Sequence, residues 1–537
     1  MKRKYLTLIY VLPFLALVIF NCSKSEAPVV ESEPEPTEET PTEETPVEEP
    51  PIVLDNEIND FVWRGLNDLY LWQADVPNLS DTEFFTMAEY ITFYNNYDDT
   101  ENLPENIIDT YFPFLNGYNT PESLFDDLIY EKDVVDKFSW IVDDYIALEN
   151  SFQGTYTSNG VDFQLVRLSG TNDIFGYVRY IANDSDASTK DIHRGDYFLT
   201  VDGQQLTINN YTNLLFGSNN TYTLGMATIS NNTISNNGKT VELTKIENFT
   251  ENPILVNKTI DVGGVKIGYL MYNQFAANFD DELNDAFAQL KADGATELVL
   301  DLRYNPGGYG YIATELASMI TGQFDGDIFY KEQWNDKYQA YFEANDPEYL
   351  LNRFVNKLSD DTPLNSLNLN RVYILTTDET ASSSELIING LNPYIDVIQI
   401  GTNTYGKFNG SVTIYDSPNF GKSNANPSHR YAMQPIVLKS TNVNDVSDYY
   451  DGLVPDYLIT YDTSSGTAEG ENILNLGELG NENEPFLAKA IELITGSTAK
   501  LDPNKTEKQG LRVDHIVSSK DFAPLGSGLI VDFKPMK

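Results

Sequence analysis

One feature constrains the fold of this sequence more than any other. Residues 255–496 alternate between strand and helix patterns around an apolar run at residues 298–302 (LVLDL). A nearly unbroken apolar run is typical of a strand buried on both faces, as in a parallel sheet covered by helices. We therefore predict an α/β domain whose sheet is packed between helices. The other predicted elements are strands at 265–271, 372–375 and 397–400 and helices at 280–292, 312–320 and 385–391.

Two further regions precede this domain and have different patterns. Residues 56–150 carry apolar residues at helical spacing, and we extend the helical assignment through residues 138–142. Residues 152–249 contain short alternating apolar runs separated by Gly, Asn and Asp, which is typical of β-strands. The sequence thus predicts a multidomain α+β protein with a small N-terminal helical domain, a β domain and an α/β domain. The predicted strands of the β domain are 163–168, 177–181, 197–201 and 241–244.

The first 55 residues have the composition of an export signal and a spacer. The apolar run at residues 6–20 is shorter than the ~20 residues that a membrane span requires. Because Cys22 follows directly, the segment resembles a bacterial lipoprotein signal, with residues 1–21 as signal peptide and Cys22 as the lipidated residue. A buried free cysteine in an uncleaved anchor helix is the alternative. Residues 22–55 form a predicted extended tether, since residues 26–50 hold ten Glu and six Pro.

Composition excludes several classes of partner. The chain has 34 Lys and Arg against 81 Asp and Glu, a net charge of −47, so an affinity for nucleic acid is not expected. One cysteine excludes an intrachain disulfide and a thiolate metal cluster, and three histidines disfavour a multi-histidine metal site. We therefore expect neither a metal nor another cofactor.

Two turns in the α/β domain join predicted strands to helices. Residues 305–308 (NPGG) place two glycines before a helix, where uncovered backbone N–H groups stabilise a developing negative charge. Residues 380–385 (TASSSE) place a serine at a helix start. Taken alone, the first is an ordinary tight turn, and the second is a capping box between Ser382 and Glu385.

Lys407 follows a glycine at the end of a predicted apolar strand. A solvated surface lysine is the common outcome for such a residue. A lysine that loses its water has a lowered pKa, however, and then serves as a general base.

Taken together, these motifs resemble peptidase family S41, which includes the carboxyl-terminal processing proteases. The resemblance covers residues 56–496 and implies a ClpP/crotonase-like core. Residues 193–203 (HRGDYFLTVDG) are in turn similar to PDZ domains, which bind the carboxyl terminus of an extended peptide at a sheet edge. The matching family motifs are residues 301–308 (DLRYNPGG), 380–385 (TASSSE), 404–407 (TYGK) and 452–456 (GLVPD).

The resemblance implies a role for particular residues. Ser382 is the expected nucleophile and Lys407 the expected base, 25 residues later. The oxyanion donors are expected to be backbone N–H groups of Gly307 or Gly308 and of Ser383. For Lys407 to stay neutral, we expect no carboxylate in contact with it. The family often has a glutamine at the position of Ser411 and an aspartate at that of Pro393, so no third catalytic residue is assigned.

Several alternatives remain at this level. His429 is a rival base, although it lies in a polar run that is typical of a loop. The implied function is a serine endopeptidase that cleaves protein or peptide substrates, anchored by Cys22 in the bacterial cell envelope, at the outer membrane and either periplasmic or surface-exposed. The alternative functions are a catalytically inactive PDZ-type peptide receptor and a carbohydrate-binding lipoprotein. Residues 497–537 either add a strand or form a tail.

Overall fold

The structure is a computed structural model that describes residues 53–86, 88–89, 92, 107–463, 466–496, 511–522, 528–531 and 533. The signal peptide, Cys22 and nearly all of the acidic tether lie outside these residues and stay predictions. Within the described part, every helix is too short or too polar to cross a membrane.

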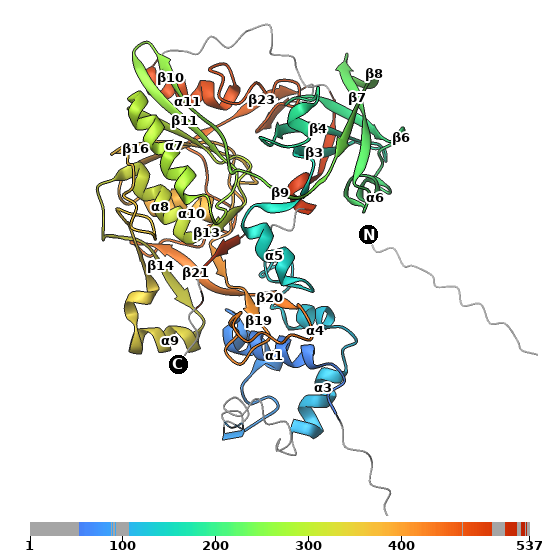
Figure 1. Ribbon diagram of the computed structural model, residues 1–537, viewed down its shortest axis with the longest axis vertical. Coiled ribbons are helices and arrows are strands. Elements are labelled where there is room, and N and C mark those ends of the chain that lie inside the picture. The colour runs from blue at the N-terminus through green and yellow to red at the C-terminus, as the bar shows by residue number, and fades with distance from the viewer. Residues whose placement is uncertain are drawn as a thin grey trace, which may run out of the picture. The chain divides into compact units, whose positions relative to one another are not determined.

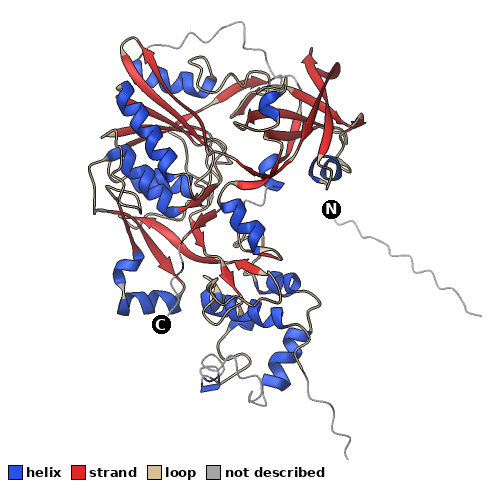
Figure 2. Ribbon diagram, in the orientation of Figure 1, coloured by secondary structure: helices blue, strands red, loops and turns tan. Residues whose placement is uncertain are grey.

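The strand–helix alternation forms a six-stranded sheet with helices on both faces, as Figures 1 and 2 show. Five strands are parallel, and the edge strand β10 is antiparallel to its neighbour. In sheet order the strands are β10 (Ile254–Val262), β11 (Val265–Tyr272), β12 (Glu297–Asp301), β16 (Arg371–Thr376), β17 (Asp396–Gly401) and β22 (Tyr457–Leu458). The helices are α7 (Asp280–Asp293), α8 (Gly310–Thr321), α10 (Ser383–Leu391) and α11 (Pro485–Thr495).

Strand β12 is buried on both faces, as its apolar run predicts. Leu298 and Leu300 belong to the core that also contains residues of α7, α8 and α10. Val299, between them, belongs to a second core with residues of α11. The predicted α/β domain and its multidomain α+β setting are therefore confirmed.

The strand-rich region after the helical segment forms a sheet of seven strands, with one strand supplied by the C-terminal part of the chain. All four strands predicted here are present. The neighbouring ribbon of β2 (Thr155–Ser158) and β9 (Ile246–Thr250) leads to the α/β domain. The sheet contains β25 (Val513–Ser518), β3 (Val161–Leu168), β4 (Ile174–Ile181), β5 (Tyr197–Val201), β6 (Gln204–Gln205), β7 (Thr221–Ser230) and β8 (Thr233–Thr244), with α6 (Tyr211–Phe216) between β6 and β7.

The N-terminal region is helical, but one predicted helical segment is wrong. Trp140–Val142 forms a strand, β1, which pairs with β20 (Ala432–Gln434) beside β19 (Ile414–Tyr415). Pairing with a strand almost 300 residues away overrides the local helical spacing, and sequence periodicity does not reveal such a partner. The helices of the region are α1 (Glu57–Leu69), α3 (Phe112–Asn116), α4 (Pro121–Leu128) and α5 (Tyr145–Phe152), with a π-helical turn at Ile107–Tyr111.

A third sheet brings together segments that are far apart in the sequence. Its order is β13 (Gly307–Tyr309), β26 (Gly528–Ile530), β18 (Asn409–Ser411), β21 (Ile436–Asn442), β14 (Ile328–Trp334) and β15 (Leu351–Arg353). Strands β25 and β26 show that the described parts of residues 497–537 add strands to two different sheets. The remaining elements are α9 (Asp336–Asn345) and the ribbon of β23 (Thr460–Thr463) and β24 (Gly466–Glu469).

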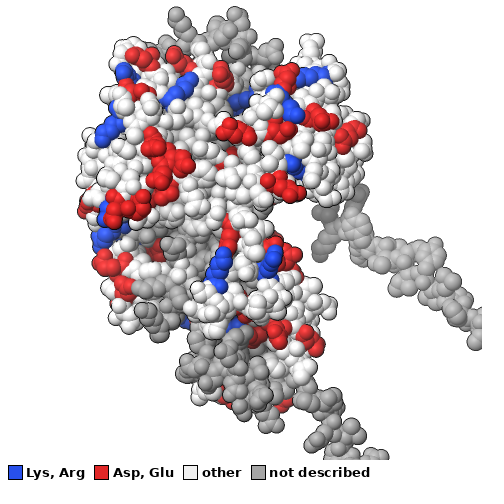
Figure 3. All heavy atoms as spheres, in the orientation of Figure 1, with Lys and Arg blue, Asp and Glu red and all other residues white. Residues whose placement is uncertain are grey.

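On the face of the molecule that Figure 3 shows, acidic residues are spread and not gathered in one patch. Figure 3 shows Asp and Glu at many separate places on the visible face, with Lys and Arg among them. Such a distribution is typical of a solvated acidic surface and not of one concentrated binding patch.

Candidate active site

Ser382 lies in a strained position at the start of α10. Its backbone has φ 61° and ψ −111°, a positive φ that a residue with a side chain rarely adopts. The side chain is only 2% exposed, and among the described residues its Oγ has no hydrogen-bond partner. Strain of this kind costs ~1–3 kcal/mol and concentrates at functional sites, which is consistent with a serine held ready to react.

The carboxylate of Glu385 connects Ser382 to Lys407. Its Oε2 accepts hydrogen bonds from the backbone N–H of Ser382 (2.7 Å) and of Lys407 (2.8 Å). Its Oε1 accepts from the backbone N–H of Gly406 (2.7 Å) and from Oγ1 of Thr404 (2.5 Å). Burial raises the pKa of Glu385 to about 7, and the hydrogen bonds that it accepts oppose this rise. The motif glutamate is thus more than a helix cap: it holds the serine turn and the lysine segment together.

Lys407 is fully buried, and burial lowers its pKa to about 7. Its Nζ lies 4.3 Å from the centroid of the Phe138 ring. Phe138 precedes β1 in the N-terminal region, so a distant segment of the chain helps to exclude water from the amine. Near neutral pH, a large fraction of this amine is therefore uncharged.

Two carboxylates act on Lys407 through space. Asp136 and Glu385 both raise its pKa, but burial has the larger effect. Each of these carboxylates already accepts hydrogen bonds from other groups. Asp136 accepts from the hydroxyl of Tyr70 (2.8 Å) and from the backbone N–H and hydroxyl of Ser139 (2.9 and 2.5 Å). The Asp136 carboxylate is therefore engaged by groups other than the amine.

The glycine turn packs directly against the serine turn. A Cβ on Gly307 would lie 2.8 Å from Cβ of Ser382, so only glycine fits here without displacement. The hydroxyl of Ser383 donates to the carbonyl of Gly308 (2.7 Å), which links the two turns. The N–H of Gly307, however, donates to Oδ1 of Asn305 (2.9 Å) and is not available to an oxyanion in this structure. Gly308 and Ser383 remain the candidate donors.

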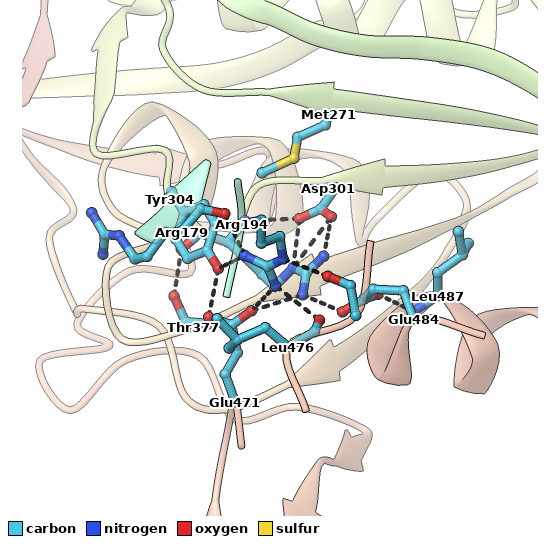
Figure 4. A network of polar contacts seen from close by, with 12 residues as sticks. Arg179, Arg194, Met271, Asp301, Tyr304, Thr377, Glu471, Leu476, Glu484 and Leu487 are labelled. Carbon is cyan, nitrogen blue, oxygen red and sulfur yellow. Dashed lines mark hydrogen bonds and ion pairs between the residues drawn. The ribbon is translucent and has the colours of Figure 1, made fainter. Parts of the chain in front are cut away.

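A buried ion-pair network supports the glycine turn (Figure 4). Arg303 is fully buried and pairs with Asp301 (2.6 Å), Glu484 (2.7 Å) and Glu471 (3.1 Å). Arg194, which belongs to the PDZ-similar segment, also pairs with Glu471 (2.6 Å). The arginine of the DLRYNPGG motif therefore acts as a structural anchor that connects the turn to the seven-stranded sheet.

A cavity of about 1280 Å³ adjoins these turns. Its lining includes Pro306, Ala381 and Tyr405, which lie within two residues of Gly307, Ser382 and Lys407 in the sequence. It also includes Gln164 and Tyr177 of the seven-stranded sheet. The cavity is large enough for several residues of a peptide, and it reaches from the serine turn to the β domain.

His429, the rival base, and Ser411, one of the two positions that depart from the family pattern, form hydrogen bonds away from Ser382 and Lys407. The Nε2 of His429 lies 3.1 Å from Asp416, and its Nδ1 accepts from the backbone N–H of Tyr431 (3.0 Å), so both ring nitrogens are engaged in a separate network. Ser411 accepts a hydrogen bond from Nε2 of Gln434 (3.1 Å). Sequence reasoning missed Asp136 and Phe138, since neither their spacing nor their residue type connects them with the motifs. Asn305 belongs to the glycine motif, but its hydrogen bond from the N–H of Gly307 was not foreseen.

Replacing Glu385 by glutamine tests whether its carboxylate braces the site, that is, whether it holds the backbone of Ser382 and Lys407 together. Glutamine has the same shape but turns an amide N–H₂ toward N–H donors, so we expect Glu385→Gln to lower the free energy of unfolding by ~2–4 kcal/mol at pH 8 in urea titrations. The control is Glu315→Gln. Glu315 is buried, its pKa is raised to about 8 by burial, and its Oε2 has no hydrogen-bond partner among the described residues, so a neutral amide at this position removes an unfavourable buried charge and should not lower the free energy of unfolding. Equal stability of the two variants would contradict the bracing role.

Comparison with known proteins identifies two segments of the chain. Residues 266–420 match the model of peptidase family S41, and residues 57–140 match that of the peptidase S41 N-terminal domain. The carboxyl-terminal-processing protease of Picosynechococcus sp. (strain ATCC 27264 / PCC 7002 / PR-6) is 30% identical over 169 residues, 32% of this chain and 35% of that protein. The chloroplastic carboxyl-terminal-processing peptidase 1 of Arabidopsis thaliana is 26% identical over 268 residues, 48% of this chain and 49% of that protein. The matches thus span between about a third and a half of these curated relatives.

The fold is shared with a solved structure. The crystal structure of an S41 family protein from Bacteroides fragilis NCTC 9343 superposes with a TM-score of 0.59 at 24% identity, covering 81% of this chain and 97% of that chain. The structural similarity therefore covers much more of the chain than residues 57–140 and 266–420, which match the family models.

Proposed function

We propose, from the two segments that match the models of peptidase family S41 and its N-terminal domain, that this chain is a serine peptidase that cleaves protein or peptide chains through Ser382 and Lys407. The observation that carries this proposal is the brace of Glu385, which holds the backbone of both residues through one carboxylate. The lowered pKa of the buried Lys407 amine provides the base that the reaction needs.

The mechanism is acyl transfer. Neutral Lys407 accepts the proton of the Ser382 hydroxyl as its Oγ attacks a peptide carbonyl. Backbone N–H groups of Gly308 and Ser383 stabilise the oxyanion, and the protonated amine then gives its proton to the leaving nitrogen as the C–N bond breaks. Water, deprotonated by Lys407, hydrolyses the acyl-enzyme and restores the serine.

Recognition and anchoring complete the proposal. The seven-stranded sheet, whose residues 193–203 are similar to a PDZ domain, would bind the carboxyl end of the substrate as an added strand. The cavity adjoins both that sheet and the serine turn, with Gln164, Tyr177 and Ala381 among its lining residues. Lipidation of Cys22 would hold the protein in the bacterial cell envelope, with the acidic segment as a spacer.

The rate of cleavage should rise with pH. Lys407 acts as a base only when it is neutral, and its pKa in the free enzyme is about 7, so we expect kcat/KM to increase through a midpoint near pH 7 and to level off above pH 8. Glu385, with a raised pKa of about 7, is ionised over the same range and strengthens the trend. The measurement is a pH profile of kcat/KM at substrate concentrations well below KM, with thermal unfolding recorded at each pH. A rate that falls between pH 6 and 8 would argue against a lysine base.

The direct test of the proposal is a search for cleaved peptides. The full chain is incubated with a peptide library, and new termini are identified by mass spectrometry with and without prior treatment by a serine-reactive fluorophosphonate. We expect cleavage that the fluorophosphonate abolishes. A chain that binds peptides but cleaves none is the inactive receptor of the alternative function.

A further inference from the structure

The last described strand of the chain lies between the two strands that carry the candidate site. Strand β26 pairs in parallel with β13, which begins at Gly307, and with β18, which begins two residues after Lys407. In Figure 1 it is the dark red strand beside β13. The C-terminal segment thus separates the glycine turn from the lysine segment.

Gly528 is the residue of β26 that meets both halves of the site. A Cβ on Gly528 would lie 3.2 Å from Nζ of Lys407. Its carbonyl oxygen lies 3.1 Å from the position that a Cβ would take on Gly307, and that same position is 2.8 Å from Cβ of Ser382. The backbone of Gly528 therefore passes between the base and the turn that adjoins the nucleophile.

The resident strand leaves no access to an external peptide. Lys407 is 0% exposed, Ser382 is 2% exposed, and Gly528 is itself buried. A nucleophile must come within about 3–3.5 Å of the carbonyl that it attacks. Because Gly528 occupies the space beside Lys407, an incoming chain binds there only after β26 has left.

Strand β26 is bound in the same way as a peptide that adds to a sheet as an extra strand. Its backbone pairs on both edges, and the N–H of Val531 donates to the carbonyl of Ser411 (3.1 Å). Leu529 enters the large core of the α/β domain, whereas Ile530 packs on Leu148 and Phe152. Main-chain pairing with alternate side chains in separate pockets is the general mode of recognition of extended peptides.

We propose that the gap between β13 and β18 is the substrate groove, and that it takes an extended chain with glycine beside Lys407 followed by aliphatic residues. The C-terminal strand is its intramolecular occupant and is displaced by substrate. The preference for glycine follows from the 3.2 Å approach of Lys407, since a larger residue would force the buried amine to move. This inference rests on the proposed function only in calling the bound chain a substrate.

The test measures binding without catalysis. The full chain carries Ser382→Ala together with Leu529→Ala and Ile530→Ala, which loosen β26, and the probe is a fluorescein-labelled peptide with the sequence of residues 528–533 (GLIVDF). Fluorescence polarisation should give a Kd at least tenfold lower than that of the chain with Ser382→Ala alone. The same peptide with valine in place of its glycine should bind at least tenfold more weakly.

A matched control separates loosening of β26 from general destabilisation. Leu165→Ala with Leu224→Ala removes equally buried side chains from the seven-stranded sheet and should leave peptide affinity unchanged. Equal affinity of the loosened chain and this control, or equal binding of the glycine and valine peptides, would overturn the proposal. If the chain binds the peptide but the native protein cleaves nothing, the proposed substrate groove is supported and the proposed peptidase function is contradicted.

If the loosened chain does not fold, hydrogen exchange of the unmodified chain gives the answer. We expect the amides of Leu529 and Ile530 to exchange at least tenfold faster than those at the centre of β21, and faster still after a fluorophosphonate has modified Ser382. Exchange as slow as that of β21 in both states would show a permanent structural strand and contradict displacement.

Discussion

Ser382→Ala should lower kcat for peptide cleavage by at least ~10⁴-fold while leaving the fold intact. The side chain is buried and its Oγ forms no hydrogen bond among the described residues, so the hydroxyl contributes little to stability. Losing it removes the only atom proposed to form the acyl-enzyme. The measurement is the hydrolysis rate of a quenched fluorescent peptide, with urea unfolding as the check on stability.

Ser384→Ala is the matched control for this change. Ser384 lies two residues further along, and its hydroxyl donates to the carbonyl of Asn305 (3.1 Å). We expect its loss to cost no more than about tenfold in rate, because this hydrogen bond positions the turn and takes no part in the chemistry. Similar rates for the two variants would mean that Ser382 is not the nucleophile.

Lys407→Met should abolish cleavage and yet make the protein more stable. Burial lowers the lysine pKa from 10.5 to about 7, and each pKa unit corresponds to 1.36 kcal/mol. At pH 7 the buried amine therefore costs the folded state up to about 4 kcal/mol, which an apolar side chain of similar length avoids. Removing the base should at the same time lower kcat by at least ~10²–10⁴-fold.

The stability gain should depend on pH in a defined direction. Between pH 7 and 10.5 the unfolded chain binds a proton that the folded chain does not, so the native protein gains stability as pH rises. The advantage of Lys407→Met should therefore shrink over that window in urea titrations. Lys258→Met, at an exposed position of β10, is the control and should change stability by less than ~0.5 kcal/mol. A Lys407→Met variant that is less stable than the native chain at pH 7 would contradict a desolvated amine.

Much of the α/β domain could be predicted because its signals are local. The run at residues 298–302 shows double burial directly, since no position in it except Asp301 is polar. The family resemblance assigned Ser382 and the glycine turn to one site, and both turns follow strands of this sheet. In the structure Gly307 packs on Ser382 as this reasoning requires.

The features of the fold and of the site that could not be predicted depend on contacts between segments that are far apart in the sequence. Phe138 covers Lys407 from the N-terminal region, and the pairing of Trp140–Val142 with β20 has no local signal. Strand β26 comes from a C-terminal segment whose pattern allows either a strand or a tail. Glu385 was visible as a capping residue, but its hydrogen bond to the backbone of Lys407 appears only when the chain is folded.

The proposed mechanism requires a large fraction of the Lys407 amine to be uncharged near neutral pH. Nuclear magnetic resonance of the full chain with ¹³Cε- and ¹⁵Nζ-labelled lysine measures this directly, with the resonance of Lys407 assigned as the one that is missing from the Lys407→Met spectrum. We predict that this resonance titrates with a midpoint near pH 7. A midpoint near 10.4, the value of a solvated lysine, would contradict the account.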